Sequence, residues 1–279
     1  MRVLTIDIGN TAVKGSVFEN GILIESILVE DLDARPFFPF IDRYRPGGAI
    51  CCSVGRDPGA FLDEIGECVG KPVMRLSHET PLPIGVEYAT PSTLGLDRIA
   101  AAAGASLVAE EALVVDAGTA VTLDIVVRNR FLGGNISPGM RLRFRSLNRF
   151  TSRLPLVSAT GDIPTFGYDT ETAIRAGVVN GIVSEIVSAY KEARKRYPRI
   201  RLLLTGGDAD FLAPHICRYG VKPVTAYSLV GKGLERIYLH AEKTDSLRTA
   251  ADINSDNNNA KYKSCLLYTS PSPRDRTRS

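Results

Sequence analysis

Two stretches of this chain share one pattern, and that repetition limits the folds it can adopt. Near the start an apolar run ends at Asp7 and leads into Gly9-Asn10-Thr11. Later a second apolar run ends at Asp116 and leads into Gly118-Thr119. In both places more apolar and β-branched residues follow, which is typical of a strand that turns back beside the first. The pattern predicts two similar α/β halves, each opening with a strand, an Asp-x-Gly turn and a returning strand.

The segments after each pattern favour mixed sheets with helices. Asn20-Gly21 between two apolar stretches indicates a two-residue hairpin, so the first half opens with antiparallel strands and not with a strand-helix-strand unit. In the first half we then expect a helix at 32–44, a strand at 49–54, a helix at 60–69, a strand at 73–76, a loop at 77–93 and an alanine-rich helix. In the second half we expect a helix ending at 149, a loop to 169, a helix at 170–197, a strand at 201–205, a helix after Gly206-Gly207-Asp208 and a last helix at 229–240.

The chain divides into two halves and a tail. We expect residues 1–110 to form the first half and residues 111–241 the second, with a shared cleft between them. Hydrophobic periodicity fades from about residue 242, so we expect residues 242–279 to be a disordered tail. From about residue 264 the tail resembles translated adapter or vector sequence, and the functional reasoning leaves it out. A native disordered tail is the alternative.

Composition excludes several classes of protein. A net charge of +3 over 279 residues, with no dense Lys/Arg block, does not indicate a nucleic-acid binder. The chain shows no apolar run long enough to cross a bilayer, and no charged leader with a cleavage site. The five cysteines show no C-x-x-C spacing, and Cys51 and Cys52 lie in an apolar run, so we expect buried free thiols. We therefore expect a cytoplasmic protein without a nucleic-acid or membrane partner.

The first Asp-x-Gly turn has the composition of a phosphate- and metal-binding loop. Glycine lets backbone N–H groups approach a phosphate without a Cβ in the way. Asp7 can hold Mg²⁺ directly or through water, because Mg²⁺ prefers oxygen ligands and keeps several waters. Asn10 and Thr11 add short polar groups, and Lys14 supplies a positive charge. Taken alone, such a turn is more often purely structural.

Two further glycine turns favour the phosphate-binding interpretation. Asp116, Gly118 and Thr119 repeat the first turn from the other half, so two such loops can oppose each other across a cleft. Gly206-Gly207, after a third apolar strand, offers another close backbone approach, suited to the adenosine of a nucleotide. Each could be an ordinary turn, but three ordinary turns at matching strand ends are much less expected.

A carboxylate and a guanidinium stand together where the alanine-rich helix begins. Gly95 to Arg98 follow a long polar loop that also brings Tyr88 nearby. Asp97 can accept a proton from a substrate hydroxyl, and Arg98 can bind an anionic substrate group bidentately. The simpler alternative is a helix cap with a surface ion pair. Thr170, before the long helix, is most simply an N-cap.

Several motifs, taken in order, resemble type III pantothenate kinase. They run from about residue 1 to residue 240 and read "DIGNTAVK", "YATPSTLGLDR", "DAGTAVTLD", "GGNISPG", "TSRLP" and "GYDTETAIRAGVVNG". The resemblance implies an α/β, duplicated ribonuclease-H-like (actin-like ATPase) fold, with two similar mixed-sheet halves around a cleft. It also implies ATP-dependent phosphorylation of pantothenate to 4′-phosphopantothenate, the first step of coenzyme A biosynthesis.

The resemblance further implies roles for individual residues, by position. As ATP-binding residues it gives Asp7, Ile8, Gly9, Asn10, Thr11, Ala12, Val13, Lys14 and Thr119. As pantothenate-binding residues it gives Tyr88, Gly95, Leu96, Asp97, Arg98 and Thr170, with Asp97 as the proton acceptor. It makes Asp116 a ligand of K⁺ or NH₄⁺, and Asp7 a Mg²⁺ ligand, directly or through water. It also implies a homodimer.

Two alternatives stay open. One is a catalytically idle regulator, like Bvg accessory factor, and the other is a different small-molecule kinase on the same fold. The presence of Asp7, Asp97, Arg98 and Asp116 together argues against the idle relative, because a regulator needs neither a base nor a cation ligand. The substrate rests on the segment from Tyr88 to Arg98, since a fold alone does not choose a substrate.

Overall fold

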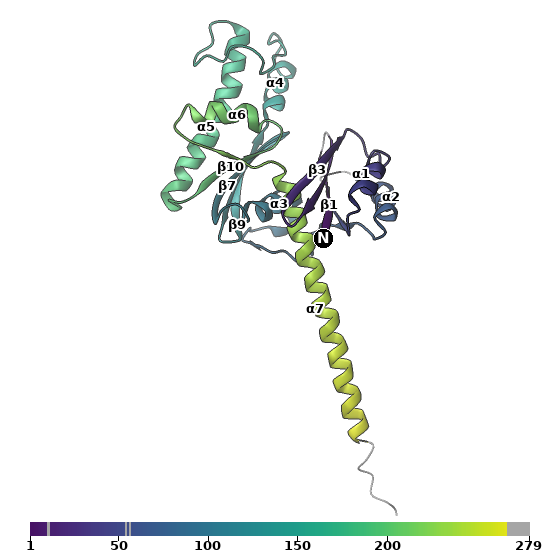
Figure 1. Ribbon diagram of the computed structural model, residues 1–279. Coiled ribbons are helices and arrows are strands. Elements are labelled where there is room, and N and C mark those ends of the chain that lie inside the picture. Colours follow the sequence, from purple (N-terminus) through teal and green to yellow (C-terminus); the bar gives the residue numbers. More distant parts are fainter. Residues whose placement is uncertain (10–11, 54, 56, 267–279) are drawn as a thin grey trace, which may run out of the picture.

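The computed structural model describes residues 1–9, 12–53, 55 and 57–266, with side chains as far as residue 247, and contains two mixed β-sheets (Figure 1). The first sheet has the order β3-β2-β1-β4-β5, in which β1 to β3 are antiparallel and β4 and β5 are parallel to β1. Asn20 and Gly21 have φ of 55° and 80° and form the predicted hairpin turn. The strands are β1 (Arg2–Ile8), β2 (Val13–Glu19), β3 (Ile22–Val29), β4 (Ala49–Ser53) and β5 (Met74–Arg75).

The second sheet repeats this plan. Its order is β11-β10-β7-β8-β9-β6, with β7 to β9 antiparallel and β10 and β11 parallel to β7. The predicted duplicated α/β architecture is therefore confirmed. The division at residue 110 stays a prediction, because β6 precedes it in the chain yet pairs with β9. The strands are β6 (Gly85–Val86), β7 (Glu111–Ala117), β8 (Ala120–Val127), β9 (Arg130–Pro138), β10 (Arg201–Thr205) and β11 (Val224–Thr225).

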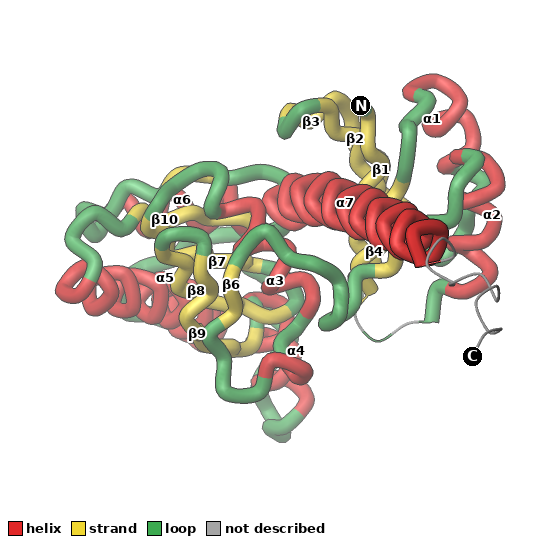
Figure 2. Tube along the Cα trace, turned by 90° about the horizontal axis from the view of Figure 1, so that it is seen from below, coloured by secondary structure: helices red, strands yellow, loops and turns green. Residues whose placement is uncertain are grey.

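Helices cover the outer faces of both sheets and fill the space between them (Figures 1 and 2). On the first sheet lie α1 (Phe37–Tyr44) and α2 (Gly59–Val69), and on the second lie α4 (Met140–Arg149), α5 (Thr170–Arg196) and α6 (Ala209–Cys217). Between the sheets lie α3 (Leu96–Ala105), preceded by the short η1 (Pro91–Thr93), and the first turns of α7 (Leu229–Leu266), which then extends away from both sheets (Figure 1). Apolar residues of both sheets, such as Val3 and Val114, pack into one core around α3 and α7. These two helices form the middle layer.

Strand alternation decides which side chains face the middle layer. In β1, Leu4, Ile6 and Ile8 pack under α1 and α2, so the intervening residues, among them Asp7, face the other way. In β7 the same alternation buries Leu113 and Val115 on the α5 side. Asp116 is therefore on the face that carries the middle layer, as Asp7 is on its own sheet.

One helix begins later than predicted, and another begins at the predicted residue but has a different N-cap. The helix expected at 32–44 begins at Phe37, because the Asp33 carboxylate accepts the Arg35 backbone N–H at 3.0 Å and holds the chain in a turn. The N-cap of α5 is Asp169 and not Thr170. The Asp169 carboxylate accepts the Thr172 backbone N–H at 2.7 Å and completes a capping box.

The last helix is longer than predicted. It was expected to end near His240, with a disordered tail from residue 242, but α7 continues to Leu266. No glycine or proline occurs between Gly233 and Pro271, so nothing local stops the helix. Residues 267–279 of the predicted tail lie outside the described part. Within the described residues no helix is both long and apolar enough to span a membrane.

Candidate active site

Three carboxylates converge where the ends of β1 and β7 meet the start of α3. Burial, and then the charge of Asp97, raises the pKa of Asp7 to about 6. Burial, and then the charges of Asp7 and Asp97, raises the pKa of Asp116 to about 7. The nearby Lys14 ammonium lowers both pKa values in part. Residues from three separate segments thus build one negatively charged site that favours a bound cation.

Because the pKa values of Asp7 and Asp116 are both raised, we predict that the stability of the folded protein depends on pH when no cations are added. Both carboxyls have an ordinary pKa of 3.8 when unfolded, so the folded state binds their protons more tightly. Their stabilising contribution is complete below pH 3.8 and is lost as the pH rises through about 6 and about 7. We expect the melting temperature of the chelator-treated wild type to fall over this window relative to Asp7→Asn/Asp116→Asn. Thermal unfolding at a series of pH values checks this, and identical profiles would contradict the coupling.

The two predicted phosphate turns are similar but not identical. In the first, the Gly9 N–H donates to the Ala12 carbonyl at 3.1 Å, and in the second the Gly118 N–H donates to the Ala120 carbonyl at 3.0 Å. The second turn is therefore one residue shorter. Gly206, with φ of +93°, packs against it, and an added Cβ there would lie 2.5 Å from Asp116 Oδ1. The third predicted glycine turn, at Gly206-Gly207, therefore lies next to the second turn.

The residues predicted to bind ATP fall into three groups. The side chains of Ile8 and Val13 are fully buried in the core of the first half, so only their backbone can face a ligand. Asn10 and Thr11 lie outside the described residues. Lys14 is at the site, and its Nζ donates to Ser228 Oγ at 2.7 Å, directly before α7.

Asp97 is held in the first turn of α3. Its Oδ1 accepts the Arg98 backbone N–H at 2.9 Å. An added Cβ at Gly95 would lie 2.5 Å from the same oxygen, so glycine at this position leaves room for the carboxylate. Leu96 packs against the core of the middle layer. Of the predicted substrate-binding residues, Gly95 to Arg98 therefore lie together beside the carboxylates of the two strands.

Arg98 is not part of a surface ion pair but of a buried one. Its side chain pairs with Asp124 of β8, and the two residues are 6% and 1% exposed. Nε lies 3.1 Å from Oδ1 and 3.2 Å from Oδ2 of Asp124, and Nη2 also donates to Oδ1. Asp124 occupies the Nε/Nη2 edge of the guanidinium, so the bidentate binding of a substrate anion by Arg98, which would need the other edge, stays a prediction.

Sequence reasoning missed Asp124, although the chain carries a sign of it. Val121 and Leu123 of β8 pack on the α5 side, so Asp124 faces α3 within an otherwise apolar strand. A carboxylate there needs a partner, because burying an unpaired charge is costly. Arg98 is that partner, but no local pattern links two residues so far apart in the chain.

Tyr88 lies with Arg98, as predicted. The rings of Tyr88 and Phe131 meet edge to face with centroids 5.8 Å apart, and the Arg98 guanidinium carbon lies 5.5 Å from the Phe131 centroid. Thr170 does not join them. It is exposed and begins α5, which packs on the opposite face of the second sheet from α3. One chain therefore does not bring Thr170 to the other predicted substrate-binding residues.

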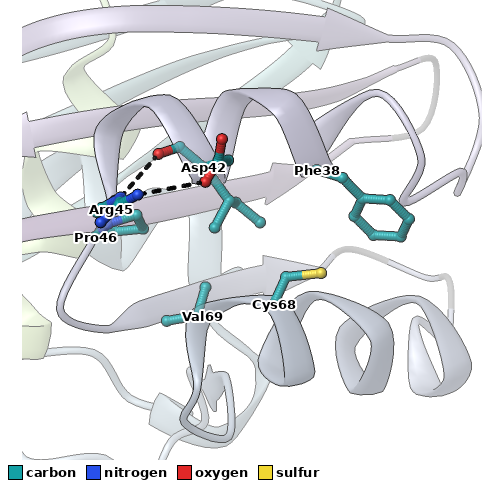
Figure 3. A pocket seen from close by; sticks show the side chains of 7 residues that line it. Phe38, Asp42, Arg45, Pro46, Cys68 and Val69 are labelled. Carbon is teal, nitrogen blue, oxygen red and sulfur yellow. Dashed lines mark hydrogen bonds and ion pairs between the residues drawn. The ribbon is translucent and has the colours of Figure 1, made fainter.

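A separate pocket of about 400 Å³ lies on the first half between α1 and α2 (Figure 3). Phe38, Arg45 and Cys68 are among its lining residues. None of the predicted site residues lines it, so the pocket is not part of the carboxylate site.

Phosphoryl transfer needs groups that bind the phosphates, offset their charge and position the nucleophile. The site offers two glycine turns, a lysine, two carboxylates at strand ends and an aspartate at the start of a helix. The fold and the site together define an ATP-dependent phosphotransferase of the actin-like ATPase superfamily. A model of the type III pantothenate kinase family matches residues 3–192. A type III pantothenate kinase from Phocaeicola vulgatus is 42% identical over 210 residues, covering 74% of this chain and 86% of that relative. The chain belongs to the type III pantothenate kinase family.

Solved structures share the fold. A conserved putative Baf family transcriptional activator from Campylobacter jejuni aligns with a TM-score of 0.55 at 24% identity, covering 84% of this chain and 96% of that one. The activator of 2-hydroxyisocaproyl-CoA dehydratase from Clostridium difficile, with bound ADPNP, aligns with a TM-score of 0.52 at 16% identity, covering 89% and 98%. At these identities the likeness concerns the fold alone.

Proposed function

We propose that this chain transfers the γ-phosphoryl group of ATP to the primary hydroxyl of pantothenate, giving 4′-phosphopantothenate and ADP for coenzyme A biosynthesis. The observation that carries this proposal is the position of Asp97 and Arg98. Both stand at the start of α3, where Asp97 is close enough to Asp7 and Asp116 for their charges to interact. A substrate held by this helix start would present its hydroxyl beside the phosphate turns. A catalytically idle regulator would not need this convergence.

Each residue has a defined task in the reaction. The Gly9 and Gly118 N–H groups close the two turns, and the other backbone N–H groups of these turns hold the ATP phosphates, with the Lys14 ammonium offsetting their charge. The adenosine lies against Gly206-Gly207. Asp97 accepts the proton of the pantothenate hydroxyl as that oxygen attacks the γ-phosphorus, and the bond to the β-phosphate oxygen breaks to release ADP.

The donor set of the site fits the cations that we propose. The oxygens of Asp7 and Asp116 are the ligand type that Mg²⁺ prefers. In the described residues no three His, Cys, Asp or Glu side chains are arranged so that they could hold a metal ion by themselves, which is compatible with an ion that keeps waters and binds phosphates. Bound Mg²⁺ would neutralise triphosphate charge and orient the γ-phosphate. We assign Asp7 to Mg²⁺, directly or through water, and Asp116 to K⁺ or NH₄⁺.

We also propose a homodimer. Large apolar side chains are exposed directly after α4 and in the segment before α5, among them Phe150 at 80%, Phe166 at 86% and Tyr168 at 73%. Exposed apolar side chains of this size are typical of protein–protein interfaces. Thr170 follows Phe166 and Tyr168 closely in the chain, so a dimer is the arrangement in which it can meet pantothenate bound to a second chain.

A cytoplasmic location is consistent with the cysteines. In the part of the chain whose side chains are described, all four are free thiols, and Cys51 and Cys52 are buried as predicted. Free thiols persist in a reducing compartment.

The identity of the product tests the proposed function. We expect mass spectrometry to show one added phosphoryl group on pantothenate, and phosphorus NMR to place it on the primary hydroxyl. A phosphorylated carboxylate or secondary hydroxyl, or an unmodified substrate, would contradict it.

A further inference from the structure

Arg98 and Asp124 form a buried ion pair. The proposed reaction involves Arg98 but gives Asp124 no task. Asp124 is 1% exposed, and its two oxygens receive Nε and Nη2 of Arg98. These hydrogen bonds use the Nε/Nη2 edge of the guanidinium and do not involve Nη1. The pair thus fixes the orientation of Arg98, whose guanidinium also takes part in a side-chain hydrogen bond with Tyr88.

The surroundings of Asp124 are shaped for this contact. Its register partner on β9 is Gly134, where an added Cβ would collide with Asp124 Oδ1. A hydrogen bond from the Thr122 side chain also acts on the Asp124 carboxylate. On the other side, the buried Phe131 ring lies under the Arg98 guanidinium, at 5.5 Å. Contacts on several sides therefore hold both members of the pair.

Stability alone is a weak reason for such a pair. Burying two charges costs free energy that their attraction only partly returns, and apolar replacements are often as stable. Burial raises the pKa of Asp124 despite the bonds from Arg98, which reflects this cost. The gain is in geometry, because a long side chain at a helix start otherwise samples many rotamers.

We propose that Asp124 is a positioning residue that holds the Arg98 guanidinium, beside Tyr88, so that it meets the carboxylate of pantothenate, while Asp97 meets the hydroxyl. This rests on the proposed function. A carboxylate accepts a stronger hydrogen bond from a guanidinium than a neutral hydroxyl does, provided that the guanidinium is held in the right orientation. The pair therefore sets the preference for the acid over neutral analogues of the same length.

Two substitutions of Asp124 and two ligands test this. Pantothenol carries a neutral hydroxymethyl group where pantothenate has its carboxylate. We expect Asp124→Ala to raise the KM for pantothenate by about 10- to 100-fold, the scale of a lost hydrogen bond to a charged group. The KM for ATP should stay within about twofold, as should the apparent affinity for pantothenol, because neither depends on this bond. Asp124→Asn keeps the shape and one acceptor oxygen, so its effect should be smaller.

A matched control separates positioning from burial. Glu235 of α7 is also a buried carboxylate of the middle layer, 2% exposed, and it accepts the Gly21 backbone N–H at 3.1 Å without contacting Arg98. Glu235→Gln should leave the KM for pantothenate unchanged. Melting temperatures of all variants show whether each is folded, and the isosteric Asp124→Asn keeps the test usable should Asp124→Ala fail to fold.

The outcomes separate this inference from the proposed function. A wild type that does not phosphorylate pantothenate overturns both. An active wild type with an unchanged pantothenate KM in both Asp124 variants overturns the positioning role alone. An equal loss of affinity for pantothenate and pantothenol also overturns it, since a general structural defect does not distinguish the acid from the alcohol. A selective loss for pantothenate supports it.

Discussion

Asp97→Asn should lower kcat by about 10²- to 10⁴-fold, the range expected when a general base is removed. The substitution keeps the shape of the side chain and an oxygen that can accept the Arg98 backbone N–H, so the start of α3 should be unchanged. Substrate binding should be affected only modestly, because the lost step is the transfer of the hydroxyl proton. Steady-state kinetics with saturating ATP and varied pantothenate measure both quantities.

A remote aspartate provides the control. Asp63 is exposed on α2, away from the carboxylate site, and Asp63→Asn should leave kcat within about twofold of wild type. Turnover near the wild-type level in Asp97→Asn would remove Asp97 from proton transfer and leave positioning as its whole contribution.

Asp116→Ala should be poorly active in potassium, ammonium and sodium alike, which is about 10²-fold or more below the wild type in potassium, the scale of losing one charge-stabilising group. The wild type should be strongly active with K⁺ or NH₄⁺ and weakly active with Na⁺, at fixed Mg²⁺ and ionic strength. The physical reason is crowding of negative charge. Asp7, Asp97 and Asp124 all raise the pKa of Asp116, and a bound triphosphate adds to this field.

The alternative for Asp116 is a second Mg²⁺ ligand or a turn cap. Either alternative gives an inactive or unstable Asp116→Ala variant, but neither gives the wild type a preference among monovalent cations. Equal wild-type rates in sodium and potassium would therefore refute the assignment of Asp116 to K⁺ or NH₄⁺ and favour Asp116 as a Mg²⁺ ligand.

The strands were predictable because their signals are local. The Asn20-Gly21 turn between two apolar stretches specifies the β2–β3 hairpin without reference to the rest of the chain. The residue at which α1 begins and the residue at which α7 ends were not predictable in the same way. One depends on a bond from the Asp33 side chain to the backbone, and the other on the absence of a helix breaker in a weakly periodic segment.

The site was predictable in part for the same reason. Asp7 and Asp116 are recognisable as carboxylates at strand ends, and matching strand ends meet in a duplicated fold. The pairing of Arg98 with Asp124 joins α3 to β8 through a contact across the core, which no spacing rule reveals. Thr170 shows the same limit, because its place depends on how α5 packs against the second sheet.

The release of ADP, measured by a coupled assay with and without pantothenate, tests the central claim most directly. With Mg²⁺ and K⁺ present, we predict little ADP from ATP alone and a saturable increase when pantothenate is added. The increase should match the phosphorylated product mole for mole. ADP release that is the same with and without pantothenate, or absent in both, would contradict the assignment of this chain as a pantothenate kinase.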